Sequence, residues 1–242
     1  MGPQGRRAWA RGARLAAVCA ISFGAVTGVS ARLVASEAVS LRALAAAAGF
    51  AFLVLWPLLA LAVYASERWL GLEPLPWLYE PEGGRRPWHL LVVVAGTVAA
   101  MFAASLLALA ILPALPPPQG PVTEYAQMSA LSRGMVATTG VWEEGVFRLA
   151  LLFPLAAALG VRNASRRVVP LGLAVAILVT GALFAAAHLP NVTNADSAYV
   201  LFTFVQKGLL VGGILGLVAW RWGVEAAVLA HVAFDAIALL AA

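Results

Sequence analysis

Seven apolar stretches follow one another along this chain, and each is close to the roughly 20 residues that a helix needs to cross a bilayer. They cover about residues 14–35, 43–65, 89–113, 136–160, 168–189, 197–220 and 223–242. A strand or an open loop in lipid would leave backbone polar groups without hydrogen-bond partners, so these stretches must be helices. The sequence therefore predicts an all-α, polytopic transmembrane bundle of about seven spans.

The composition excludes a sizeable soluble domain. Of 242 residues, 62% are hydrophobic and only 11% are charged, whereas a soluble domain carries roughly 25% charged residues. The net charge of +5 comes from loop arginines, which indicates membrane orientation rather than a nucleic-acid partner. Fifteen arginines, one lysine and abundant alanine point to a GC-rich bacterium. The expected location is the cell membrane, specifically a bacterial inner membrane.

The loop arginines also orient the bundle, because cytoplasmic loops are enriched in positive charge. With the N-terminus inside, the inside loops carry eleven arginines and the outside loops carry three. Val29-Ser30-Ala31 could alternatively end a cleaved signal peptide, but we expect an uncleaved first helix. The single cysteine, Cys19, excludes a disulfide framework.

An acidic pair lies inside the fourth apolar stretch. Glu143 and Glu144 are followed by Arg148, and charged groups at membrane depth are costly enough to suggest a functional site. Glu144 and Arg148 are four residues apart, so they share a helix face and can pair. Glu143 is rotated by about 100° from Glu144 and is the free, reactive candidate. The alternative is that both acids only join a buried ionic network.

Two histidines fall in later apolar stretches. Phe184 lies one turn before His188, where its ring can pack beneath the imidazole. Pro190 disfavours continuation of that helix beyond His188. His231 and Asp235 are also one turn apart, a spacing that can orient an imidazole, relay protons or bind a metal. Either pair alone has an ordinary structural explanation.

The predicted topology places Glu143, His188, His231 and Asp235 in the same half of the bilayer. A convergent Glu/His/His/Asp pocket, open to water on one side, explains this placement. The single lysine, Lys207, falls near the middle of the sixth stretch. Its side chain either extends to the interface or neutralises one of the acids.

The three motifs, in this order, resemble the CPBP family of intramembrane proteases, which includes the type II CAAX prenyl endopeptidases and bacterial proteins linked to bacteriocin processing or immunity. The family pattern is two glutamates followed after three residues by arginine, then Phe-x-x-x-His, then His-x-x-x-Asn or Asp. The resemblance covers residues 136–242, which it implies are a four-helix catalytic core. It leaves residues 1–135 as N-terminal transmembrane helices with their connecting loops.

The resemblance implies that Glu143 and His188 activate a water molecule for attack on a peptide carbonyl. It assigns the oxyanion to His231 and the residue at position 235. Here that residue is aspartate, and an ionised carboxylate would repel an oxyanion, so Asp235 is expected either to be protonated or to orient His231. Zinc held by His188, His231 and a carboxylate is the mechanistic alternative. We expect the cofactor-free route, because the sequence has no HExxH-like pair.

The expected function is therefore hydrolysis of a peptide bond near the membrane surface, in a peptide or membrane-protein substrate. A proton-coupled transporter is one alternative, because intramembrane acids, histidines and lysines are typical of proton paths. A non-catalytic immunity or scaffold protein of the same fold is another. A leader peptide, a signal-peptide remnant or a membrane-protein segment is the expected kind of substrate.

Overall fold

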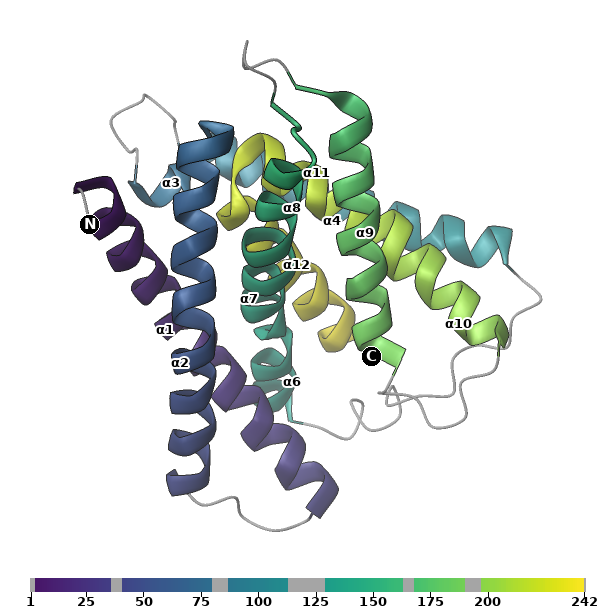
Figure 1. Cartoon of the computed structure of the whole chain (residues 1–242). Coiled ribbons are helices and arrows are strands. Elements are labelled where there is room, and N and C mark those ends of the chain that lie inside the picture. Colours follow the sequence, from purple (N-terminus) through teal and green to yellow (C-terminus); the bar gives the residue numbers. More distant parts are fainter. Residues whose placement is uncertain are drawn as a thin grey trace.

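The computed structural model describes residues 3–35, 41–79, 87–112, 129–162, 168–189 and 197–241. Within these ranges the chain is helical, and its only strand-like feature is an isolated bridge between Arg162 and Val168. The described helices form seven rods and one short connecting helix (Figure 1). The rods are α1 (Pro3–Ala35); α2 (Leu41–Ala65) with η1 (Ser66–Leu70); α4 (Pro87–Ile111); α6 (Ala130–Ala137), α7 (Thr139–Glu144), η3 (Gly145–Leu152) and α8 (Phe153–Ala158); α9 (Pro170–His188); α10 (Ser197–Thr203), η5 (Phe204–Val211) and α11 (Gly212–Trp222); and α12 (Val224–Ala241).

This architecture confirms the predicted all-α membrane bundle. In the part of the chain that the structure describes, four helical segments are long and apolar enough to cross a membrane: Ala48–Leu70, Pro87–Ile111, Pro170–His188 and Ser197–Trp222. Each is close to the length required by the hydrocarbon core. Three rods contain π-helical segments, the labels of which begin with η. Such wide turns are frequent at functional sites.

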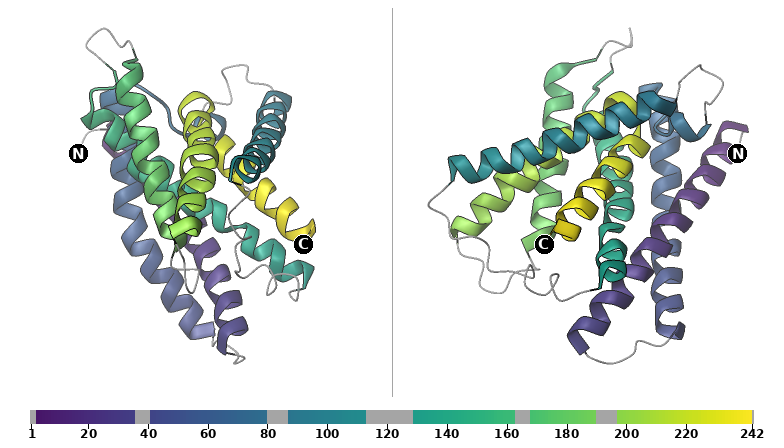
Figure 2. Two further views of the ribbon diagram at one scale, coloured as in Figure 1. Left: turned by 90° about the vertical axis from the view of Figure 1, so that its right-hand side faces the viewer. Right: turned by 180° about the vertical axis from the view of Figure 1, so that it is seen from behind.

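The first two rods lie side by side and flank the fourth rod (Figure 2). Contacts from α1 reach the start of α7, where Ser22 donates a hydrogen bond to the carbonyl oxygen of Thr138. The thiol of Cys19 lies 3.7 Å from the carbonyl oxygen of Val141. Near the other end of the pair, Arg11 forms ion pairs with Glu67 and Glu73. The contacts of Ser22 and Cys19 hold the N-terminal pair against the rod that carries the acidic motif, whereas the Arg11 ion pairs tie α1 to the end of the second rod and the segment after it.

The turn between α11 and α12 sets the course of the last helix. Gly223 has φ of 102°, a left-handed conformation that residues with a side chain rarely adopt. Beyond it, α12 crosses both α7 and α4, and the rings of Phe102 and Phe234 pack 4.6 Å apart. A Cβ atom at Gly140 would lie 3.0 Å from Cγ of His231. The absence of a side chain at Gly140 therefore lets α12 bring His231 close to the acidic motif.

Candidate active site

Glu144 is the central acceptor of a buried cluster between α7, η3 and α12. Its Oε1 lies 2.9 Å from Nδ1 of His231, and its Oε2 lies 3.2 Å from Nε of Arg148. The side chains of Glu144 and Arg148 are fully buried. The predicted pairing of these two residues is therefore confirmed, and Glu144 also reaches an imidazole on the last helix. A carboxylate oxygen only accepts hydrogen bonds, so His231 donates through Nδ1.

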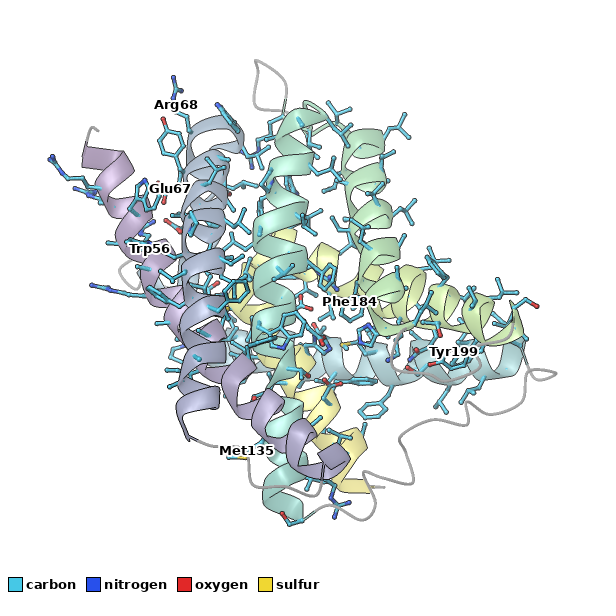
Figure 3. All side chains as sticks on the ribbon, turned by 60° about the horizontal axis from the view of Figure 1, so that its bottom comes forward. Trp56, Glu67, Arg68, Met135, Phe184 and Tyr199 are labelled. Carbon is cyan, nitrogen blue, oxygen red and sulfur yellow. The ribbon has the colours of Figure 1, made fainter. Side chains whose placement is uncertain are left out.

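Arg148 has an aromatic neighbour as well as its carboxylate. Its Cζ lies 4.9 Å from the centre of the Phe184 ring, within the distance at which a cation is attracted to an aromatic face. The ring of Phe147 packs edge-on against Phe184 at 5.3 Å. Phe184 lies in the middle of the bundle (Figure 3) and is almost completely buried. The guanidinium thus sits between an anion and an aromatic ring, away from solvent.

The other nitrogen of His231 faces two further carboxylates. Nε2 lies 3.7 Å from Oε2 of Glu143 and 3.5 Å from Oδ2 of Asp235. These separations exceed a normal hydrogen bond, so neither carboxylate is hydrogen-bonded to Nε2. The side chain of Asp235 is 25% exposed, against 11% for Glu143 and 5% for His231. Asp235 is therefore the most accessible member of these three groups.

His188 ends α9, as its position before Pro190 predicts. Its Nδ1 lies 2.8 Å from the carbonyl oxygen of Phe184. Because a carbonyl oxygen only accepts, Nδ1 carries a proton, and in the neutral ring Nε2 retains a lone pair. The Phe184 ring lies 4.6 Å from the His188 ring and 5.7 Å from the His231 ring. The predicted packing of Phe184 against His188 is confirmed, and this same ring joins His188 to the rest of the cluster.

The lysine charge also acts on this region. Lys207, from η5, lies close enough to the carboxyl groups of Glu143 and Asp235 and to the imidazole of His188 for its charge to influence them, without a direct ion pair in the described residues. Gly208, the next residue, packs against Gly181 and Ala185 of α9, which places this turn of η5 beside the helix that ends at His188. Of the two alternatives left open by the sequence, this placement favours Lys207 as a neutralising charge.

The shared imidazole was not expected from the sequence. Helical spacing separates Glu143 from Glu144 by about 100°, and we expected the two to face different parts of the bundle. Instead, Oε2 of Glu143 and Oε1 of Glu144 lie on opposite sides of the same His231 ring. The ring is wide enough to be reached from two directions. No spacing along the chain signals this arrangement, because it depends on how α12 crosses α7.

Zinc, the mechanistic alternative, would need three ligands within reach of one ion. Among the described residues, no three histidine, cysteine, aspartate or glutamate side chains are placed to share a metal ion. The choice between a metal-free site and zinc held by His188, His231 and a carboxylate therefore stays a prediction.

The fold and the site define a class of protein: a membrane helix bundle with a buried Glu–Glu–His–Asp cluster, next to a second histidine and a lysine. Residues 126–237 match the family model described as type II CAAX prenyl endopeptidase Rce1-like. Residues 126–237 therefore form an Rce1-like domain, which is consistent with the CPBP family that the three motifs resemble. No curated protein and no solved structure matches the chain.

Proposed function

We propose that this protein is an intramembrane endopeptidase in which Glu143 activates a water molecule. The observation that carries the proposal is the arrangement of Glu143, Glu144 and Asp235 around one imidazole, that of His231. Peptide hydrolysis needs a base for water and donors for the developing negative charge. The family match at residues 126–237 supports a protease reaction.

Glu143 is the base in this mechanism. Glu144 forms an ion pair with Arg148, whereas among the described residues Glu143 has only His231 within ion-pair distance. It takes a proton from water as the oxygen attacks the peptide carbonyl. His188 assists Glu143 by accepting a hydrogen bond from the water molecule at Nε2. This nitrogen has a lone pair in the neutral ring, because Nδ1 holds the proton and donates to the carbonyl oxygen of Phe184. The proton held by the base is then delivered to the leaving amine, which restores the starting state.

His231, as an imidazolium with a proton on each ring nitrogen, stabilises the oxyanion through Nε2, and Glu144 holds the ring in position by accepting from Nδ1. A catalytic side chain whose orientation is fixed by a third group is a common arrangement in enzyme active sites. An ionised Asp235 beside Nε2 would oppose the developing charge, since like charges close together are costly in an apolar site. Lys207 supports catalysis by offsetting that charge, because it interacts with Asp235 and with Glu143.

We further propose that the reaction needs no metal ion. The donor geometry described above supports this, since the ligands that zinc would use are not grouped. Treatment with a strong zinc chelator is expected to leave the cleavage rate within about twofold of the untreated value, whereas catalytic zinc is essential in enzymes that use it. Loss of activity on chelation, restored by added zinc, would contradict the metal-free route.

The substrate is a peptide segment in or at the bilayer, and the protein is a multi-pass protein of the cell membrane. The location of the cluster between apolar helices supports a membrane-associated substrate. A leader peptide, a signal-peptide remnant or a membrane-protein segment fits a bacterial inner membrane better than a prenylated protein does. The partners are therefore a peptide or membrane protein and the lipid bilayer, with no nucleic acid.

The activity can be tested by comparing cleaved peptide termini in membranes that contain the wild-type protein or the His231→Gln variant. His231 contacts three carboxylates, so its replacement removes both the donor and its orienting contact. New termini are expected with the wild-type protein and not with the variant at equal protein levels. Identical terminal profiles would contradict a peptidase function. Proton-coupled uptake into vesicles that is lost with His231→Gln would instead support a transporter.

A further inference from the structure

A cavity of about 340 Å³ lies near the short helix α3 (Pro76–Tyr79), at the end of the bundle opposite the His188 end of α9 (Figure 1). It opens between α3, the start of α4 and the end of α11. The cavity is lined by Trp77, His89, Val92, Val93, Arg221 and Trp222. None of these residues belongs to the proposed catalytic cluster, so the cavity requires an explanation of its own.

The cavity lies at the level of a membrane–water interface. The candidate span Pro87–Ile111 begins two residues before His89, and the candidate span Ser197–Trp222 ends at the cavity wall. Tryptophan side chains are enriched where spans meet the lipid headgroups, and Trp77 and Trp222 both line the cavity. The position thus favours a ligand that itself resides at the interface.

The wall of the cavity is held in a fixed shape. The indole Nε1 of Trp77 donates to the carbonyl oxygen of Trp222 at 2.7 Å, and its backbone N–H donates to Oε1 of Glu225 at 3.0 Å. The backbone N–H of Val224 donates to the carbonyl oxygen of Pro74 at 2.9 Å. These bonds tie α3 to the turn between α11 and α12, so the site is formed before any ligand arrives.

The polar rim of the cavity is cationic. Arg221 is exposed in the last turn of α11, and no carboxylate in the described ranges forms an ion pair with it. Its planar guanidinium matches the geometry of a phosphate group. His89, also exposed, lies in the first turn of α4 and adds a second nitrogen donor. The rim can therefore bind an anion with several hydrogen bonds.

The floor of the cavity is apolar. Val92 and Val93 lie about one turn beyond His89 on α4, toward the middle of the span, and Val92 is 60% exposed. A free phosphate ion would gain nothing from these side chains, whereas an amphiphile would cover them. We propose that this cavity binds an anionic phospholipid, with its phosphate at Arg221 and His89 and its glycerol and first acyl carbons over Val92 and Val93.

The bundle orientation supports this ligand. The positive-inside rule places the loop arginines, including Arg221, on the cytoplasmic side. The cytoplasmic leaflet is rich in anionic lipids, and basic pockets between helices on that side bind such headgroups. The expected role is to anchor the α3–α11 end of the bundle at a defined depth, independently of catalysis.

The test is lipid-dependent thermal stability of the purified full chain in neutral detergent micelles. A ligand that binds only the folded state raises the unfolding temperature by an amount that grows with the logarithm of its concentration above Kd. Phosphatidylglycerol is expected to raise it, whereas phosphatidylcholine and inorganic phosphate are not. The variant Arg221→Gln is expected to need about tenfold more phosphatidylglycerol for the same rise in unfolding temperature, which is the loss of affinity typical of one charge-assisted hydrogen bond.

Two further variants complete the experiment. Arg6→Gln removes an exposed arginine outside the cavity and is expected to retain the wild-type response. Val92→Trp fills the cavity mouth without changing charge and is expected to abolish the response even if Arg221→Gln folds poorly. Equal responses to both phospholipids, or an Arg221→Gln response equal to that of Arg6→Gln, would overturn the proposal. A shift produced by inorganic phosphate would overturn the lipid as ligand and assign a soluble phosphate instead.

Discussion

Glu144 contacts two buried groups through its two oxygens: it forms an ion pair with Arg148 and a hydrogen bond with His231. At residue scale this makes it the structural centre of the cluster. Burying an ion pair costs desolvation of both charges, and the pair stabilises only while both partners are present. A change at Glu144 should therefore disturb folding more than a change at Glu143, which has no hydrogen bond to Arg148 or His231 among the described contacts.

We predict that Glu144→Gln lowers the free energy of unfolding by about 3–5 kcal/mol, the cost of leaving one buried charge unpaired. The measurement is unfolding of the purified protein in detergent, by heat or by denaturant. Glu67→Gln is the matched control, because the Arg11–Glu67 pair is partly exposed and such pairs contribute about 0–1 kcal/mol. The double variant Glu144→Gln with Arg148→Met should recover part of the loss. Equal effects of Glu144→Gln and Glu67→Gln would contradict this role.

Lys207 and Asp235 provide a second test at residue scale. If Lys207 offsets the carboxylate of Asp235, then Lys207→Met should lower kcat by at least about tenfold, or roughly 1.4 kcal/mol of barrier. Adding Asp235→Asn removes the opposing charge and should restore most of the rate, so the two changes should not be additive. Additive losses in this double-mutant cycle would mean that the two charges do not act on each other in the reaction.

Spacing along a helix predicted three contacts of the cluster: Glu144 with Arg148, His231 with Asp235, and Phe184 with His188. Each pair is four residues apart in one rod, so its geometry is local. The contact between Glu144 and His231 joins residues 87 positions apart. It depends on the crossing of α12 over α7, which no local pattern encodes.

At the scale of elements, the contact between α9 and the η5–α11 rod depends on glycine. A Cβ atom at Gly181 would lie 2.4 Å from the carbonyl oxygen of Gly208, and one at Gly216 would lie 3.1 Å from Ile177. Small residues permit such close helix packing in membranes. Gly212 and Gly216 are four residues apart on one helix face, and both lie against α9.

We predict that Gly181→Ala lowers the free energy of unfolding by about 1–3 kcal/mol, because the added methyl group forces the two backbones apart. The control is Gly213→Ala, where nothing lies within 4 Å of the new Cβ. That variant should be neutral or more stable by up to about 1 kcal/mol, since alanine favours helix over glycine. The two variants are compared by thermal unfolding in the same detergent. Equal stabilities would show that the close approach of α9 to η5 is absent.

The apolar stretches predicted the elements themselves, with differences at their ends. The first rod begins at Pro3 rather than near residue 14, and the fourth begins at Ala130 rather than at residue 136. A helix can continue into polar residues beyond its apolar stretch. Hydropathy therefore locates the part of a helix that lies in lipid, but not the ends of the helix. The π-helical turns of η3 and η5 were not predicted, because no residue type specifies them.

At the scale of the whole molecule, we predict that the two chain ends lie on opposite sides of the membrane. An odd number of spans with a cytoplasmic N-terminus places the C-terminus outside. Fusions at the C-terminus test this: alkaline phosphatase should be active and green fluorescent protein should be dark in a bacterial host. A fluorescent C-terminal fusion would show that the number of spans, or the orientation, is wrong.

The division of the chain into residues 1–135 and 136–242 stays a prediction. The family match begins at residue 126, and α6 begins at Ala130, so the matched domain includes the whole fourth rod. The contacts of Ser22 and Cys19 with α7 indicate that the N-terminal pair supports the acidic motif. Co-expression of the two parts as separate chains would show whether the second part needs the first for cleavage.

The central claim is that Glu143 activates water for peptide hydrolysis. The most direct measurement is kcat/KM of purified, reconstituted Glu143→Gln on a cleaved peptide identified in membranes, compared with Glu67→Gln at matched folding. The account predicts a loss of at least about 100-fold for Glu143→Gln, as expected when a general base is removed, and a change within about twofold for Glu67→Gln. Full peptidase activity in a folded Glu143→Gln variant would contradict it.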